Sequence, residues 1–347
     1  MTHNPDRGRF FEDFALGQTL IHATPRTLTP GDTALYTALY GARFALQTSD
    51  VFAAACGLPR SPVDDLVAFH AVFGKTVPDI SLNAVANLGY AEARFLKPVF
   101  PGETLSAVSE VIGLKETSSG KAGIVWVRTL GKNAAGETVL SFCRWVLVRK
   151  RDPGHPAPPA VVPDLRPALA PEDLTPPRLD LARYDWVAAG DGRGWGDFSV
   201  GEILDHRDGV TVEEAEHMMA TRLWHNTARV HFDASLRPDG RRLVYGGHVI
   251  SVARALSFNG LENAFGIAAI NAGTHVNPCF AGTTVTAWSE VLDKAPPGPS
   301  GLGALRTRLV ACAAGGRPGV LRDAGGSYDP NVLLDLDLWL WMPDRPA

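Results

Sequence analysis

The stretch PVFPGETLSAVSEV, residues 98–111, decides how the chain is organised, because PCFAGTTVTAWSEV at residues 278–291 repeats it. Eight of the fourteen positions are identical, and no gap separates the two copies. Agreement at this level is hard to obtain by chance, and self-similar segments are typical of duplicated structural units. The repeat therefore indicates two related domains.

A second repeated block supports the duplication. The pattern Asp-Phe-x-x-Gly occurs at residues 13–17 and again at residues 197–201. Each copy is followed at the same spacing by a histidine, His22 in the first half and His206 in the second. The two blocks keep the same order in both halves, so we interpret the chain as the product of a gene duplication.

A proline-rich segment separates the two copies. Nine of the 26 prolines fall within residues 153–177. Proline at this density excludes a helix or a central strand and is typical of an extended, semi-rigid linker. We therefore predict a first domain at residues 1–152, a linker at 153–180, and a second domain at 181–347.

Each half also shows the same coarse pattern of elements. Helix-permissive, alanine-rich stretches come first, at residues 33–46 and 66–77 and then at 212–226 and 246–257. β-Branched, partly alternating strands follow at residues 93–99, 104–114, 122–131 and 138–148, and then at 274–280, 284–292, 305–313 and 332–342. A helix followed by antiparallel strands, given twice, predicts an α+β fold.

Composition limits the class of protein. The net charge of −4 gives no basic surface for nucleic acid. The first residues, MTHNPDRGRF, contain no apolar segment of the kind found in signal peptides, and no apolar run approaches the roughly 20 residues of a membrane helix. We expect a cytoplasmic protein with neither a nucleic-acid nor a membrane partner.

The four cysteines are far apart, form no CxxC pair and have apolar neighbours, which favours buried free thiols: Cys56, Cys143, Cys279 and Cys312. His225 and His231 do not have the HExxH spacing of a zinc-binding helix. We therefore expect no metal.

Several segments resemble the MaoC-like hydratase family. FFEDFALGQTL at residues 10–20 resembles the opening of these proteins, and RFLKPVFPGETL at residues 94–105 resembles their strand–turn–strand. Residues 34–53, 223–235 and 244–257 resemble, more narrowly, the mesaconyl-CoA hydratase branch, also known as β-methylmalyl-CoA dehydratases. The resemblance covers nearly the whole chain apart from the linker.

This resemblance implies a double hot-dog fold, in which each half is an antiparallel sheet wrapped around a central helix. It also implies reversible hydration of mesaconyl-CoA to (2R,3S)-β-methylmalyl-CoA, in carbon metabolism of the ethylmalonyl-CoA-pathway type. No cofactor is implied, since CoA is part of the substrate. The fold leads us to expect a homo-oligomer.

The family's hydratase motif, Asp-x-Asn-x-x-His-x-Asp, is resembled only in the second half. Aligning its histidine with His231 places its last aspartate on Asp233, its asparagine on Ala228 and its first aspartate on Asn226. An amide cannot act as a base but can orient water or a carbonyl. The resemblance thus implies proton transfer by His231, with Asn226 and Asp233 as further catalytic candidates. In the first half Ala45 replaces the histidine, so that half is expected to supply substrate-binding wall.

The remaining candidates would bind the substrate. The resemblance places a backbone N–H on the thioester oxygen at Gly246 and Gly247, and glycine lets the backbone approach a ligand closely. His248 follows as a neighbouring candidate. Mesaconyl-CoA carries a second carboxylate, and arginine is a bidentate partner for carboxylates. Arg229 and Arg43 are the candidates for that contact.

Three other functions remain open at this stage. One is hydration of a simpler enoyl-CoA. A second is a hot-dog thioesterase, in which Asp233 or Asp50 would aim at a water near the thioester carbon. A third is a non-catalytic acyl-CoA-binding protein, which Asn226 at the family's aspartate position makes plausible.

Overall fold

The computed structural model describes residues 8–345 of the chain, so the extreme N-terminus considered above for a signal peptide lies outside it. The helices are α1 (Pro30–Tyr40), α2 (Ala45–Thr48), α3 (Asp50–Ala55), α4 (Asp65–Thr76), α5 (Glu214–Leu223) and α6 (Gly246–Leu256). The strands are β1 (Thr19–Ile21), β2 (Arg26–Thr27), β3 (Ala84–Phe95), β4 (Thr104–Glu116), β5 (Ala122–Lys132), β6 (Thr138–Arg149), β7 (Ile203–Thr211), β8 (Gly266–His275), β9 (Thr284–Ala295), β10 (Leu302–Ala313) and β11 (Val332–Pro343).

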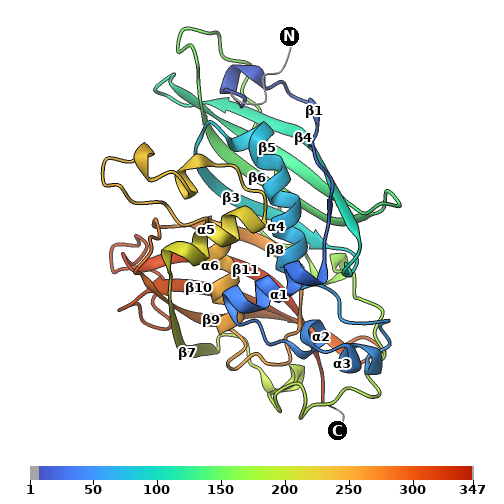
Figure 1. Ribbon diagram of the computed structural model, residues 1–347. Helices are drawn as coiled ribbons and strands as arrows, with labels where there is room; N and C mark the ends of the chain where they lie inside the picture. The colour runs from blue at the N-terminus through green and yellow to red at the C-terminus, as the bar shows by residue number, and fades with distance from the viewer. Residues whose placement is uncertain (1–7, 346–347) are drawn as a thin grey trace.

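All the strands belong to one antiparallel sheet that runs through both halves. Its order is β1-β4-β5-β6-β3-β8-β11-β10-β9-β7, with β2 paired to β4 at one edge. The first five strands come from the first half and the last five from the second, in mirrored order. The halves meet where β3 pairs with β8, for example Tyr90 opposite Gly273. The expected α+β fold, with two tandem repeats, is confirmed (Figure 1).

The repeated sequence blocks form the same structure twice. Each Asp-Phe-x-x-Gly block ends on a glycine with a left-handed backbone, Gly17 at φ 74° and Gly201 at φ 87°. His22 Nε2 bonds the Ser109 hydroxyl at 2.7 Å, and the corresponding His206 Nε2 bonds the Ser289 hydroxyl at 2.8 Å. The repeated histidines therefore tie each edge strand to its neighbour, which is a structural role.

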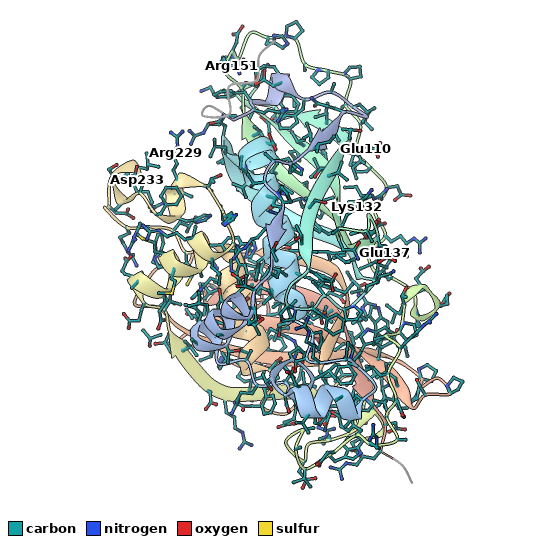
Figure 2. All side chains as sticks on the ribbon, turned by 45° about the vertical axis from the view of Figure 1, so that its right-hand side comes forward. Glu110, Lys132, Glu137, Arg151, Arg229 and Asp233 are labelled. Carbon is teal, nitrogen blue, oxygen red and sulfur yellow. The ribbon has the colours of Figure 1, made fainter. Side chains whose placement is uncertain are left out.

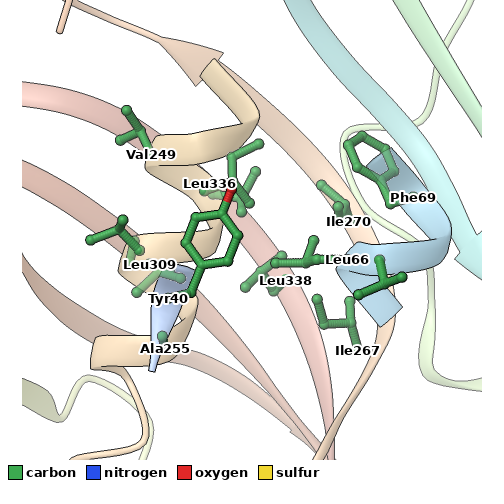
Figure 3. Close-up of a cluster of buried hydrophobic side chains, with 14 of the residues drawn as sticks. Tyr40, Leu66, Phe69, Val249, Ala255, Ile267, Ile270, Leu309, Leu336 and Leu338 are labelled. Atoms are coloured by element: carbon green, nitrogen blue, oxygen red, sulfur yellow. The ribbon is translucent and has the colours of Figure 1, made fainter. Parts of the chain in front are cut away.

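The long helices α4 and α6 lie on the same side of the sheet, one over each half (Figure 1). Apolar side chains of both helices join those of the strands in one buried cluster, which includes Leu66 and Phe69 of α4 and Val249 of α6 (Figure 3). Leu336 and Leu338 of β11 lie within the same cluster. The two halves thus share a continuous core.

The proline-rich segment is anchored to the sheet. Between β6 and β7 the described chain forms no helix apart from two single turns, one within this segment at residues 171–173 and one after it at residues 195–197. Val161 bridges to Leu114 of β4. Further along, the Leu169 N–H donates to Asn271 of β8 at 2.9 Å, and its carbonyl accepts from Trp339 of β11 at 3.0 Å. The segment is therefore held against both halves.

One helix and two strands differ from the sequence-based expectation. The predicted helix at residues 33–46 ends at Tyr40, because Gly41 adopts a left-handed backbone at φ 66° and closes the helix. The predicted strands at residues 93–99 and 274–280 begin much earlier, as β3 and β8. Both strands are rich in alanine and glycine, so they lack the β-branched pattern on which the prediction depended.

Within the described chain no helix is long and apolar enough to cross a membrane. All four cysteines are buried and free, as expected.

Replacing Gly74 by alanine is expected to lower the free energy of unfolding by about 3 kcal/mol. A Cβ at this position of α4 would lie 1.7 Å from the Trp224 carbonyl oxygen, and backbone cannot move aside as a flexible side chain can. Denaturant unfolding measures the change. The control is Gly31→Ala in α1, where the nearest atom lies at 3.4 Å. Equal stability of the two variants would contradict this packing.

Candidate functional site

A cavity of about 310 Å³ lies between the two halves. The first half contributes the end of α4, the turn after it, the first part of β3, and one residue of β6. The second half contributes residues 226–231, the segment leading into α6, and the residues that end β8 and follow it. Most of the lining is apolar, as is typical of ligand pockets, and few polar groups converge on it.

His231 is the first of those polar groups. It lies at the end of the single turn Arg229–His231, and its Nδ1 is 2.8 Å from the Leu243 carbonyl oxygen. A carbonyl only accepts hydrogen bonds, so Nδ1 carries the proton and the lone pair of the neutral ring is on Nε2. Nε2 has no hydrogen-bond partner within residues 8–345. Burial lowers the pKa of His231 to about 4, so the ring is neutral at pH 7.

Asn226 is brought to the same pocket and is buried. Its side-chain oxygen accepts from the Ala228 N–H at 3.0 Å, which fixes the amide plane. The side-chain NH₂ group keeps its donors for a ligand, because no acceptor for it lies within the described residues. Asn226 can therefore orient a water molecule or a carbonyl oxygen, as expected from its amide.

The start of α6 also faces the pocket. Tyr245 precedes the helix and offers no side-chain cap to its first N–H groups, which have no partner within the helix. Gly246 lines the pocket, whereas Gly247 packs below it against Tyr245 and His70. Free N–H groups and the helix dipole suit a developing negative charge.

His248 and Asp233 are not among the residues that line the pocket. His248 is buried on the inner side of α6 with its ring 5.2 Å from that of Tyr40. Asp233 accepts from the Ser235 N–H at 3.0 Å and from its hydroxyl at 2.6 Å, and so caps the turn Ala234–Leu236. Neither side chain is therefore expected to contact the substrate.

Neither predicted arginine lines the pocket. Arg43 donates to Asn259 at 2.9 Å and stacks on Phe258, at the surface. Arg229 is exposed on the same outer loop as Asp233, at the edge of the molecule (Figure 2). Asp50, considered for a thioesterase, accepts from the Ser61 N–H at 2.8 Å and is exposed. All three side chains therefore lie outside the pocket.

Several other polar residues line the pocket that sequence reasoning did not select, and four of these lie on strands. Tyr90 and Asn87 come from β3, His275 from β8 and Arg144 from β6. His275 Nε2 is 3.2 Å from the Tyr90 hydroxyl, and burial lowers the pKa of His275 to about 4. The one available signal in the sequence is that Arg144 is the only charged residue in the predicted strand at residues 138–148.

The place in the first half that corresponds to this pocket is almost closed. A cavity of only about 60 Å³ lies at the start of α4, beside Asp65, and the linker residue Pro177 forms part of its wall. Asp65 accepts from the Ile267 N–H at 2.7 Å, so its carboxylate closes the position that Gly246 leaves open. Of these two corresponding positions, the one at the start of α6 is therefore the open one.

The described residues contain no group of three or more His, Cys, Asp or Glu side chains that could hold a metal ion.

Replacing Gly246 by alanine is expected to lower the turnover of a bound substrate by about 100-fold while the fold is retained. The reason is that the new methyl group displaces the His275 ring in the pocket. The added Cβ would lie 2.4 Å from Cε1 and 2.5 Å from Nε2 of His275. Steady-state kinetics measure the loss. Gly298→Ala is the control, since no atom lies within 4 Å of the new Cβ. Unchanged turnover in G246A would exclude a close approach of ligand to this glycine.

Known proteins match this chain along almost its whole length. The family model described as mesaconyl-CoA hydratase matches residues 2–318. A mesaconyl-CoA hydratase of Cereibacter sphaeroides is 65% identical over 337 residues, covering 97% of this chain and 98% of the relative. A β-methylmalyl-CoA dehydratase of Chloroflexus aurantiacus is 57% identical over 353 residues, covering 99% and 100%.

Solved structures with a similar fold also cover almost the whole chain. A crystal structure from Chloroflexus aurantiacus, with a proposed identity as a MaoC domain dehydratase, superposes with a TM-score of 0.96. It is 56% identical and covers 99% of this chain and 100% of its own. A Mycobacterium tuberculosis protein with a double hotdog fold is 24% identical with a TM-score of 0.73, covering 96% and 98%. The expected double hot-dog fold is confirmed.

Proposed function

This chain belongs to the mesaconyl-CoA hydratase family, and we propose that it catalyses the reversible addition of water to mesaconyl-CoA, giving (2R,3S)-β-methylmalyl-CoA. The match to the family along nearly the whole chain supports the substrate. The observation that carries the chemistry is the state of His231. Its Nδ1–H is held by the Leu243 carbonyl, so a neutral Nε2 with a free lone pair faces the pocket.

Hydration of an enoyl thioester begins with the activation of water. In the proposed step, His231 Nε2 accepts a proton while the water oxygen forms a bond to the β carbon. Asn226 positions that water through its side-chain NH₂ group. The lowered pKa of His231 keeps the ring able to accept the proton across the neutral range.

The electron pair of the double bond moves as the water oxygen attacks. It passes through the α carbon to the thioester oxygen, which becomes an enolate oxygen. The Gly246 N–H at the start of α6 stabilises this charge, because the helix dipole and the unpaired donor both favour an anion there. The enolate collapses when the α carbon takes a proton from the imidazolium of His231. Water has then been added with the thioester intact.

Two competing functions find less support in this pocket. A thioesterase reaction needs a carboxylate near the thioester carbon, and no aspartate or glutamate is among the described residues that line the cavity. A pure binding protein has no use for a neutral histidine with a free lone pair inside an apolar pocket.

The remaining parts of the function are proposals of the same kind. The reaction adds water without net oxidation or reduction, and the chain's own groups are assigned both the proton transfer and the stabilisation of charge. The proposal therefore requires no redox cofactor or metal, and CoA enters as part of the substrate. We propose that the enzyme is cytoplasmic, because acyl-CoA esters are metabolised there. We also propose that this two-domain chain assembles into a homo-oligomer.

The test is incubation of the purified protein with mesaconyl-CoA while two signals are followed. The proposal predicts loss of the ultraviolet absorbance of the conjugated enoyl thioester, without release of a free thiol. Release of thiol would instead support a thioesterase. No change in either signal, with binding of the ester seen by calorimetry, would reject the catalytic proposal.

A further inference from the structure

Arg144 is the least expected side chain in the pocket. It lies in the middle of β6 and is 0% exposed, with its guanidinium 4.4 Å above the Phe73 ring. Nη2 donates to the hydroxyls of Thr76 at 2.8 Å and Ser81 at 3.3 Å. Nε and Nη1 are buried and have no hydrogen-bond partner. A buried charge with unused donors is costly unless an anion pairs with it.

No acidic side chain supplies that anion. The described residues that line the pocket include no aspartate or glutamate, and the ionisable groups that act on Arg144 are the phenols of Tyr90 and Tyr245. Burial lowers the pKa of Arg144 to about 10, so it remains a cation at pH 7. The other deeply buried arginine, Arg254, lies near two carboxylates, Asp64 and Asp65.

The fold does not require a charge at position 144. In the second half, Leu338 precedes Trp339 as Arg144 precedes Trp145, and each pair occupies the same place in its strand. Arg144 lies opposite Tyr90 of β3, and Leu338 lies opposite Ile270 of β8. Leu338 is a fully buried core residue (Figure 3). The duplicated fold is therefore stable with an apolar side chain here, and the arginine needs another explanation.

A second unpaired group lies in the same pocket. Both polar atoms of the Asn87 side chain are buried and have no hydrogen-bond partner. Asn87 belongs to β3, the strand that pairs with the strand of Arg144. Unsatisfied buried polar groups are uncommon in folded proteins, and two in one cavity indicate a ligand group that satisfies both.

We propose that Arg144, assisted by Asn87, binds the free carboxylate of the substrate and makes the pocket selective for enoyl-CoA esters that carry a second carboxylate. The inference rests on the proposed function, because that function supplies such a substrate. In mesaconyl-CoA the free carboxylate is attached to the β carbon, so a guanidinium that holds it also positions the carbon that water attacks. The thioester oxygen then lies toward Gly246.

The test compares two substrates in the wild type and in Arg144→Leu, which introduces the residue that the second half carries at this place. The substrates are mesaconyl-CoA and 2-methylcrotonyl-CoA, in which a methyl group replaces the free carboxylate. For mesaconyl-CoA, R144L is expected to lose about 1,000-fold in kcat/KM, since a site built for a charged partner discriminates strongly. For 2-methylcrotonyl-CoA, kcat/KM is expected to stay within about 3-fold of wild type or to rise.

Two further variants make the result specific. Arg43→Leu removes an arginine outside the pocket and is expected to leave the ratio of the two kcat/KM values unchanged. Arg144→Lys keeps the charge without the planar fork, is the less disruptive substitution should R144L not fold, and is expected to reduce that ratio by about 10-fold.

The same comparison is made for binding, by calorimetry with both CoA esters, so that the two proposals can fail separately. If the wild type binds mesaconyl-CoA more tightly and R144L or R144K loses this preference, the inference holds even where turnover of mesaconyl-CoA is absent. If the folded variants keep the wild-type preference in binding and turnover, or lose both esters equally, Arg144 has only a structural role and the inference is overturned.

Discussion

Replacing His231 by alanine is expected to lower kcat for mesaconyl-CoA by about 1,000-fold while the Kd for the ester changes little. The reason is that no second group in the described pocket combines an accessible lone pair with a fixed tautomer. The Leu243 carbonyl fixes the proton of His231 on Nδ1. Nε2 of the other pocket histidine, His275, is bound to the Tyr90 hydroxyl.

Single-turnover kinetics and calorimetry together measure the effect of H231A. The matched control is His155→Ala, because that histidine is exposed in the proline-rich segment. Turnover of H231A within about 10-fold of wild type would remove His231 from the proton transfer, since general base catalysis contributes more than that. Equal loss of binding and turnover would give it a structural role instead.

Mild acid is expected to destabilise the fold strongly. Burial lowers the pKa of five histidines to about 3 or 4: His70, His206, His231, His248 and His275. Their unfolded values lie near 6.5, so between pH 6.5 and 4 the unfolded chain binds these protons and the folded chain does not. Above pH 6.5 these histidines do not lower the free energy of unfolding. As the pH falls from 6.5 to 4, they lower it progressively.

Two carboxyl groups oppose this trend. Burial raises the pKa of Asp65 to about 7 and also raises that of Asp64, so the folded state takes up these protons first. The histidines still leave the unfolded chain with a surplus of at least three protons. The free energy of unfolding should then fall by about 4 kcal/mol per pH unit in the middle of the window.

Denaturant unfolding at several pH values between 7 and 5 measures this slope. His206→Asn should reduce it by about 1.4 kcal/mol per pH unit, the contribution of one titrating group. His155→Asn, at an exposed residue of the proline-rich segment, is the control variant. A wild-type slope below that of a single group would contradict the burial of these histidines in neutral form.

Much of the fold could be predicted because duplication leaves a pattern that a single sequence can show. The repeated glycines Gly17 and Gly201 and the repeated histidines His22 and His206 are required by backbone geometry and by a buried hydrogen bond, so both copies retain them. The family resemblance then supplied the hot-dog arrangement, which periodicity alone does not give.

The pairing of the strands where the two halves meet could not be predicted. Strands β3 and β8 pair at the centre of the sheet, where close neighbours require small residues. A Cβ on Gly89 would lie 2.4 Å from the Trp145 ring, and one on Gly273 would lie 2.7 Å from Leu336. Small residues weaken the β-strand pattern, so the strands that join the domains are the hardest to find by sequence.

The site was predictable only where its residues are close together in the sequence. The motif located His231 and Asn226, and the pair of glycines at the start of α6 located Gly246. Asn87, Arg144 and His275 come from three strands that only the folded sheet brings to one pocket. The reverse holds for Asp233 and Arg229, which are near His231 in sequence but point out of the loop (Figure 2).

The most direct test of the central claim is mass spectrometry of mesaconyl-CoA incubated with the enzyme in ¹⁸O-labelled water. We predict a product that has gained one labelled water, keeps the CoA thioester, and carries the ¹⁸O on the β carbon. Label in free mesaconate beside free CoA, or recovery of unlabelled mesaconyl-CoA alone from folded enzyme, would contradict the assignment of this pocket to hydration.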